Sequence, residues 1–272
     1  MTVHEYNDTV LSVDALRELR CLVCGASKGI GRATAISLAK AGASVIAIAR
    51  SEEKLDSLLG QLNLINNGIH STYVVDLEKS DSIDMALEDI AENHGHIHVL
   101  INNSGGPPSG ALLDVESEEF IQYLRRHLLA SHHIVKKLIP GMEEDGYGRI
   151  INILSTSVRE PIPNIGLSNT VRGAMASWAK SLAMELPTCV TINNILPGFT
   201  DTGRLESLAN SVADKRGVTP DKIREQWISQ VPAGRLARPE ETAAAISFLA
   251  SPAAGYIRGI SLAVDGGRMK SI

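Results

Sequence analysis

Three glycines, spaced as Gly25-x-x-x-Gly29-x-Gly31, separate a short apolar run from an alanine-rich segment that ends near Lys40. The apolar run has the length of a buried strand and the alanine-rich segment has helical spacing, so backbone N–H groups are expected at a helix N-terminus. Their partial positive charge suits a phosphate, and glycines let a pyrophosphate approach the backbone. This pattern predicts a dinucleotide-binding turn. Its candidate binding residues are Gly25, Ser27, Lys28, Gly29, Ile30 and Gly31.

Polar residues directly follow three further apolar runs. These residues are Arg50, Asp76 and Asn102. Ligands of open parallel sheets bind outside the carboxyl ends of the strands, so all three side chains are candidates for the same site. Asp76, with Leu77 beside it, could accept a hydrogen bond from an adenine amino group; a cap on the next helix is the alternative.

Arg50 bears on the choice of dinucleotide. It stands 19 residues beyond Gly31, where an NAD site would place a carboxylate on the ribose hydroxyls. An arginine there can instead pair with a 2′-phosphate, and Lys28 adds a second positive charge. We expect NADP(H) to be preferred and NAD(H) to be possible. Solvated surface cations are the alternative interpretation of both side chains.

The elements that must position these residues alternate along the chain. Apolar runs predict strands at residues 21–24, 45–49, 72–75, 99–101, 149–154, 190–196 and 260–264. Amphipathic segments between them predict helices, including one capped by Ser117 that reaches about Leu138. This alternation predicts an α/β fold, a three-layer doubly wound (Rossmann) parallel sheet of about seven strands in a single domain.

We divide the chain into an N-terminal extension, residues 1–18, and a Rossmann-type domain, residues 19–272. Within that domain the charged segment 203–235 is expected to form a substrate lid or insertion. Cys21, Cys24 and Cys189 are expected to be packed free thiols, because they lie in apolar, strand-like segments.

Composition narrows the class of protein. The chain has 272 residues, 44% of them hydrophobic, and a formal net charge of -5 without a basic stripe, which argues against a nucleic-acid partner. Its apolar runs fall short of the roughly 20 residues that a membrane span requires. The first twenty residues are too acidic for a signal peptide, so a cytoplasmic location is expected.

The chain resembles the short-chain dehydrogenase/reductase superfamily, especially the 3-oxoacyl-acyl-carrier-protein reductases, over about residues 18–267. The motifs that carry this resemblance are Cys24-Gly-Ala-Ser-Lys-Gly-Ile-Gly31, Asn102-Asn-Ser-Gly105, Pro197-Gly198 with Thr202, Pro239-Glu-Glu241 and Val264-Asp-Gly-Gly267. Cys24 replaces the usual threonine and Ser104 the usual alanine. The resemblance implies that the glycine turn holds the diphosphate and that the following residues also contact the cofactor: Asn102, Ser104, Gly105, Pro197, Gly198, Thr200 and Thr202.

The Asn-Ser-Tyr-Lys tetrad of that family is largely replaced. Ser155 fits the serine position; the tyrosine position, 13 residues later, holds Ser168, and the lysine position, four further on, holds Arg172. The asparagine position falls on His127. A serine hydroxyl is a much weaker acid than a phenol, and an arginine keeps its proton, although Arg172 could still bind the nicotinamide ribose. His127 could supply a proton near neutral pH, or it could be a packed histidine.

Two functions therefore remain open. The first is an NADP(H)-dependent oxidoreductase that reduces a carbonyl (3-oxoacyl-like) or enoyl substrate, free or thioester-linked, with an atypical proton donor. Its catalytic candidates are Ser155, Ser168, Arg172 and His127. The alternative is a weak or inactive dinucleotide-binding homologue that acts as a sensor or oligomer partner. The resemblance also implies a homo-oligomer, either a dimer or a homotetramer.

Overall fold

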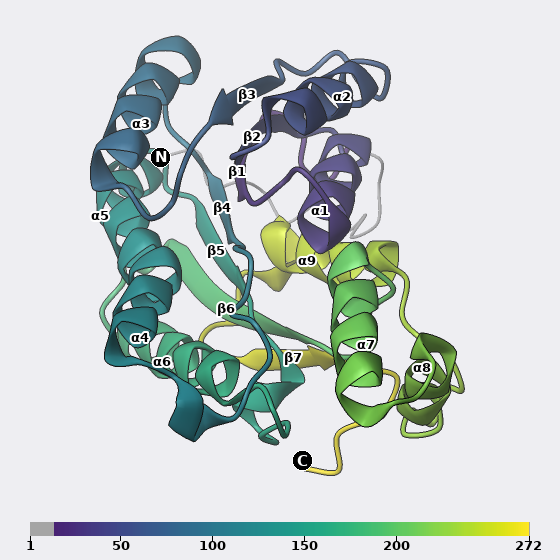
Figure 1. The fold of residues 1–272 in the computed structure, drawn as a ribbon. Helices are drawn as coiled ribbons and strands as arrows, with labels where there is room; N and C mark the ends of the chain where they lie inside the picture. The colour runs from purple at the N-terminus through teal and green to yellow at the C-terminus, as the bar shows by residue number, and fades with distance from the viewer. Residues whose placement is uncertain (1–13, 272) are drawn as a thin grey trace.

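A seven-stranded parallel sheet forms the centre of the part of the chain that the structure, a computed structural model, describes: residues 14–271 (Figure 1). The strands are β1 (Arg20–Cys24), β2 (Ser44–Ala49), β3 (Ser71–Val74), β4 (Val99–Asn102), β5 (Gly148–Ile153), β6 (Val190–Pro197) and β7 (Ser261–Val264). They lie in the order β3-β2-β1-β4-β5-β6-β7, and each neighbouring pair is parallel. The predicted doubly wound sheet is confirmed. Its order reverses between β1 and β4, where such folds bind ligands.

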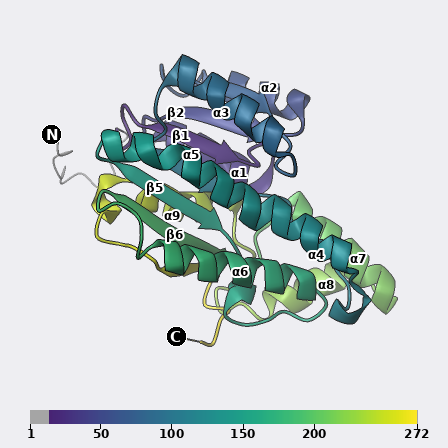
Figure 2. The same ribbon diagram turned by 90° about the vertical axis from the view of Figure 1, so that its left-hand side faces the viewer.

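Helices cover both faces of the sheet (Figure 2). One face packs against α1 (Gly29–Lys40), α2 (Glu52–Leu62) and α9 (Pro239–Ala250). The other packs against α3 (Ser80–His94), α5 (Ala130–Glu144) and α6 (Gly166–Leu182). Single-turn helices η1 (Leu112–Asp114), η3 (Thr156–Val158) and η4 (Pro252–Ala254) lie in the connections. The helices formed by residues 14–271 are too short or too polar to cross a membrane.

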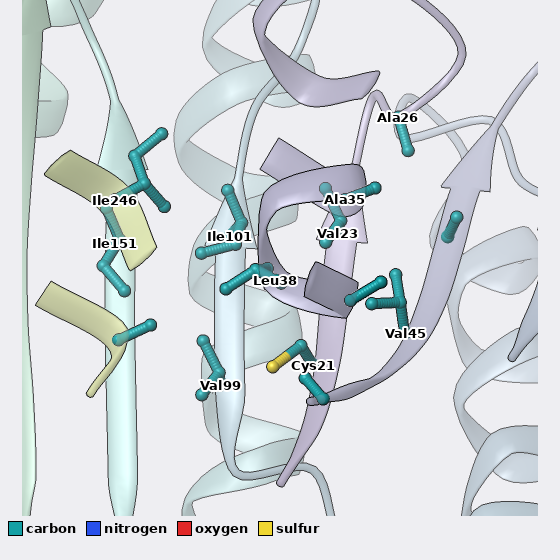
Figure 3. Packing of buried hydrophobic residues seen from close by; sticks show 14 of the residues in the cluster. Cys21, Val23, Ala26, Ala35, Leu38, Val45, Val99, Ile101, Ile151 and Ile246 are labelled. Carbon is teal, nitrogen blue, oxygen red and sulfur yellow. The ribbon is translucent and has the colours of Figure 1, made fainter. Parts of the chain in front are cut away.

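The period of two along β1 divides the core into two clusters. Cys21 and Val23 point to α1 and α9, as Figure 3 shows for Cys21 and Leu38, whereas Leu22 and Cys24 point to the opposite face. The two cysteines therefore lie on different sides of the sheet. Both are buried free thiols, and burial raises the pKa of Cys24 to about 12. The prediction of packed thiols is confirmed for them.

The helix expected after residue 116 is longer and less regular than predicted. Its N-cap is Glu116 rather than Ser117, and α4 (Ser117–Leu124) runs into a π-helical turn, η2 (Arg125–Leu129), before α5 begins. The helix then continues past Leu138 to Glu144, with Pro140 inside it. Met142, beyond the proline, is fully buried in the core, so tertiary packing outweighs the local cost of Pro140.

The charged segment after residue 202 forms two helices, α7 (Gly203–Arg216) and α8 (Pro220–Ile228). They pack together through a small cluster of their own, Ala209, Ala213 and Ile223. At the other end of the chain, residues 1–13 of the expected extension lie outside the described residues. Leu16, near the end of that extension, is buried in the main core.

Candidate functional site

A cavity of about 560 Å³ opens at the carboxyl ends of the central strands. Its lining residues come from many separate segments, from the first glycine turn to the first turns of α7. The predicted residues that line it are Gly25, Ser27, Lys28, Gly29, Ile30, Arg50, Asp76, Leu77, Ser104, Gly105, Ser155, Ser168, Arg172, Pro197, Gly198, Thr200 and Thr202. Most of the residues selected from the sequence are therefore brought together in one place.

The glycine turn has the close backbone approach that the spacing predicts. Gly25 and Gly29 have φ angles of 60° and 56°, a region that side chains disfavour. A Cβ on Gly31 would overlap the carbonyl oxygen of Gly25, so Gly31 closes the turn rather than lining the cavity. Asn103 fixes the turn from β4, because its Nδ2 donates to the carbonyls of Cys24 and Gly25 at 3.3 and 3.1 Å.

The donor set around this turn fits a phosphorylated dinucleotide. Within the described residues, the N-terminus of α1 has no side-chain cap, and Gly29 and Ile30 of its first turn line the cavity, so the N–H groups there are available to a phosphate. Lys28, Arg50 and Lys54 supply three cations on the same side. Asp76 also lines the cavity and is not the cap of α3, whose N-cap is Lys79.

Asn102 differs from the expectation for a cofactor ligand. Its side chain is buried in the sheet, where Nδ2 donates to Asn152 Oδ1 at 2.8 Å. Asn152 donates in turn to Asn194 Oδ1 at 2.9 Å, and Asn194 donates to Ser261 Oγ at 3.1 Å. We call these three asparagines and the serine at their end the asparagine ladder. Its hydrogen bonds join β4, β5, β6 and β7. The neighbouring residue, Asn103, lines the cavity instead, because successive strand residues face opposite ways.

Arg172, which the resemblance predicts at the lysine position, is fixed by three hydrogen bonds. Its Nη1 donates to the carbonyls of Ile153 and Leu154 at 2.9 and 2.8 Å, and its Nε donates to Ser168 Oγ at 3.3 Å. Burial, with the nearby charge of Arg204, lowers the pKa of Arg172 to about 10. The guanidinium is therefore still protonated at neutral pH. It can place a fixed positive charge in the cavity, but it is a poor proton donor.

His127 is buried behind the cavity and is held neutral. Its Nε2 lies 3.2 Å from the carbonyl oxygen of Gly105, which can only accept, so Nε2 carries the hydrogen. Nδ1 then accepts from Ser104 Oγ at 2.8 Å. Burial first, and then the charge of Arg172, lower the pKa of His127 to about 3. A neutral, buried imidazole favours the second of the two alternatives for His127, a packed histidine, over a proton donor near neutral pH.

Several lining residues were not selected as site residues from the sequence: Lys54, Asn103, Gly106, Arg126 and Arg204. Arg204 nevertheless belongs to the charged segment 203–235 that was expected to form a substrate lid. Lys54 stands four residues after Arg50, a helical spacing that could have indicated it. Arg126 and His127 both reach Gly105 from the π-helical turn, and the sequence gives no signal for that turn. Arg126 is anchored there by an ion pair with Glu78.

Comparison with known proteins gives a family match over most of the chain. Residues 25–268 match the family model described as enoyl-(acyl carrier protein) reductase. A 3-oxoacyl-[acyl-carrier-protein] reductase of Thermotoga maritima is 32% identical over 253 residues, which cover 91% of this chain and 96% of that protein. The NADPH-dependent reductase BacG of Bacillus subtilis is also 32% identical over 253 residues, covering 92% of this chain and 97% of that protein.

Solved structures share the architecture. The L-sorbose reductase from Gluconobacter frateurii, solved in complex with NADPH and L-sorbose, superposes with a TM-score of 0.90 at 26% sequence identity. That superposition covers 96% of this chain and all of the sorbose reductase.

Proposed function

This chain belongs to the short-chain dehydrogenase/reductase superfamily, and we propose that it is an NADP(H)-dependent reductase of a conjugated carbonyl (enoyl) substrate. The cofactor part of the proposal is supported by the uncapped N-terminus of α1, by the cations around it and by the NADPH-dependent relatives. When bound, NADPH supplies a hydride. The glycine turn and Lys28 would hold its diphosphate, and Arg50 its 2′-phosphate.

The observation that carries the substrate class is the fixing of Arg172 by the carbonyls of Ile153 and Leu154. A ketone that is reduced directly becomes an alkoxide and needs a proton donor beside its oxygen. An enoyl compound becomes an enolate, whose oxygen needs a fixed positive charge and whose carbon can take a proton from water. Arg172 can provide that charge, and the Ser168 hydroxyl beside it can provide a hydrogen bond. Neither group is acidic enough to donate a proton to an alkoxide efficiently.

Direct reduction of a 3-oxoacyl substrate is the second candidate. It is favoured by the 3-oxoacyl reductases among the relatives and by Ser155, which lines the cavity at the position of the family's serine. Its proton donor would have to be atypical, since Ser168 stands where the tyrosine is expected.

We also propose that α7 and α8 act as a lid over the substrate end. Residues of the first turns of α7, among them Arg204, Leu205 and Leu208, line the cavity, whereas α8 packs on the outer side of α7. Family resemblance supports a homo-oligomer as the assembled form.

A matched pair of neutral compounds tests the reaction. Benzylideneacetone and benzylacetone differ only in the conjugated double bond, and an acetoacetyl thioester provides a 3-oxoacyl compound. We expect NADPH oxidation with benzylideneacetone and formation of benzylacetone, with little reduction of the other two. Arg172→Gln should lower this rate by about a hundredfold or more, as for loss of an oxyanion-stabilising donor.

The remaining outcomes separate the alternatives. Preferred reduction of the acetoacetyl thioester would establish the second candidate. If Ser168→Tyr with Arg172→Lys is required before that thioester is reduced, the natural chain is not a ketoreductase. Tight NADPH binding without turnover of any carbonyl or enoyl compound would favour a sensor or an oligomer partner. Failure to bind NADPH or NADH at millimolar concentration would refute both the reductase and the dinucleotide-binding sensor.

A further inference from the structure

Two guanidinium groups meet at the substrate end of the cavity. Arg172 belongs to α6 and Arg204 to the first turn of α7, and Gly106 lies between them. A Cβ built on Gly106 would stand 3.3 Å from the Nη2 of Arg172 and 3.9 Å from the Nη2 of Arg204. Two positive charges from distant parts of the chain are thus directed at one small volume.

The described residues provide these two arginines with no acidic partner. The ion pairs found in residues 14–271 involve other cations, and Asp76 is the single acidic residue among those that line the cavity. Asp76 lies at the other end, beside Leu77 and the residues after β3. Unpaired cations that approach one another are normally costly, so the arrangement favours an anion between them.

Hydrogen-bond donors remain for such an anion. Arg172 uses Nη1 and Nε on the backbone of Ile153 and Leu154 and on Ser168, which leaves Nη2 directed toward Gly106. The Nη2 of Arg204 donates to the carbonyl of Pro107, which fixes the direction of the guanidinium and leaves the N–H groups of Nη1 and Nε for an anion. Like-charge repulsion from Arg204 also contributes to the lowered pKa of Arg172, so the two guanidinium groups interact electrostatically.

The cofactor does not account for this pair. Its phosphate sites would be the glycine turn and the cations Lys28, Arg50 and Lys54, which are contributed by the β1–α1 and β2–α2 connections and the start of α2. In the family resemblance, the position of Arg172 faces the nicotinamide ribose, whose hydroxyls carry no charge. The second positive charge at Gly106 is left for the substrate.

We propose that Arg204 binds a carboxylate of the substrate, while Arg172 holds a carbonyl oxygen that lies a few bonds from that carboxylate. The substrate class is then a conjugated oxo or enoyl acid with a free carboxylate, rather than a neutral thioester. This inference rests on the proposed reductase function for its turnover assay, but carboxylate binding can also be measured without turnover.

Benzoylacrylate and its methyl ester test the inference, because one methyl group removes the negative charge of the carboxyl group. We expect KM for the acid to be at least about tenfold below KM for the ester, as for a charge-assisted hydrogen bond. Arg204→Gln should raise KM for the acid about tenfold and leave KM for the ester and the Kd of NADPH unchanged. Arg216→Gln, at the far end of α7, is the matched control and should behave as the wild type.

A second variant changes the space rather than the charge. Gly106→Ala places a methyl group between the guanidiniums and should raise KM for benzoylacrylate about fivefold or more, an order-of-magnitude expectation for a displaced charged contact. Gly110→Ala lies in the same connection with nothing within 4 Å of its added Cβ and is the control.

Three results would overturn the inference: equal KM values for acid and ester, equal effects of Arg204→Gln on both, or an Arg204→Gln variant that loses NADPH affinity instead. The last would assign Arg204 to the cofactor phosphates. If neither compound is reduced, calorimetric titration of benzoylacrylate into the NADP⁺-saturated protein decides the point. Binding that Arg204→Gln removes would support the carboxylate site while the proposed reductase function fails, and absence of binding would refute the site.

Discussion

The Oγ of Ser104 lies 2.8 Å from Nδ1 of His127, although 23 positions separate them in the chain. The resemblance predicts that these two residues replace an alanine and an asparagine of the family. In the structure the two side chains form a single contact. Since the other imidazole nitrogen faces the carbonyl of Gly105, the pair fixes the connection that borders the cavity.

This pair makes the stability of the protein dependent on pH. The pKa of His127 is about 3 in the folded chain and about 6.5 when unfolded, so the unfolded chain binds the extra proton between these values. The contribution of His127 is present above pH 6.5 and is lost as the pH falls toward 3. At pH 5 we expect a loss of about 2 kcal/mol relative to pH 8.

Denaturant titration at both pH values measures that loss. His127→Asn should reduce the difference between pH 8 and pH 5 by about 2 kcal/mol. His132→Asn, which changes an exposed histidine on α5, should keep the wild-type difference. An unchanged pH dependence in His127→Asn would show that the imidazole is not held neutral.

Gly31 is predicted to be intolerant of any side chain. A Cβ there would overlap the Gly25 carbonyl, and its next neighbour is Asn103 Nδ2 at 2.7 Å, so Gly31→Ala must open the turn. We expect NADPH affinity to fall about a hundredfold or more, because the N–H groups of the turn no longer converge on the phosphates. Gly60→Ala, on the exposed face of α2, is the control; it should keep NADPH affinity and stabilise the fold by about 0.5–1 kcal/mol.

Arg50 is predicted to set the preference between the two dinucleotides. Arg50→Gln should weaken NADPH binding about tenfold or more and leave NADH binding nearly unchanged, since only NADPH carries the 2′-phosphate. Calorimetric titration with both dinucleotides measures this, with Lys40→Gln at the opposite end of α1 as a control. Equal losses for NADPH and NADH would mean that Arg50 serves a part of the cofactor that the two share.

The asparagine ladder is predicted to stabilise the sheet beneath the site. Asn152 is fully buried and bonded on both sides, so Asn152→Ala leaves the Nδ2 of Asn102 without its acceptor and the Oδ1 of Asn194 without its donor. We expect the free energy of unfolding to fall by about 3 kcal/mol. Asn93→Ala, on the exposed surface of α3, should change it by less than about 0.5 kcal/mol. A similar effect of both substitutions would show that the ladder contributes little.

The sequence alone determined the features that depend on local pattern. Short apolar runs located the seven strands, helical spacing located the main helices, and the glycines located the turn between β1 and α1. Counting from Ser155 led to Ser168 and Arg172, which both line the cavity. Each of these follows from steric or periodic properties of residues that are close together in the chain.

Tertiary structure alone decided what those residues can do. In the folded chain Asn102 bonds within the sheet, whereas Asn103 lines the cavity. Burial keeps His127 neutral, and two backbone carbonyls fix Arg172. Tertiary structure also brought Arg204 to Pro107, 97 positions away, and so to Gly106 and Arg172. Burial and distant charges set the protonation and direction of a side chain, and both arise only when separate segments pack together.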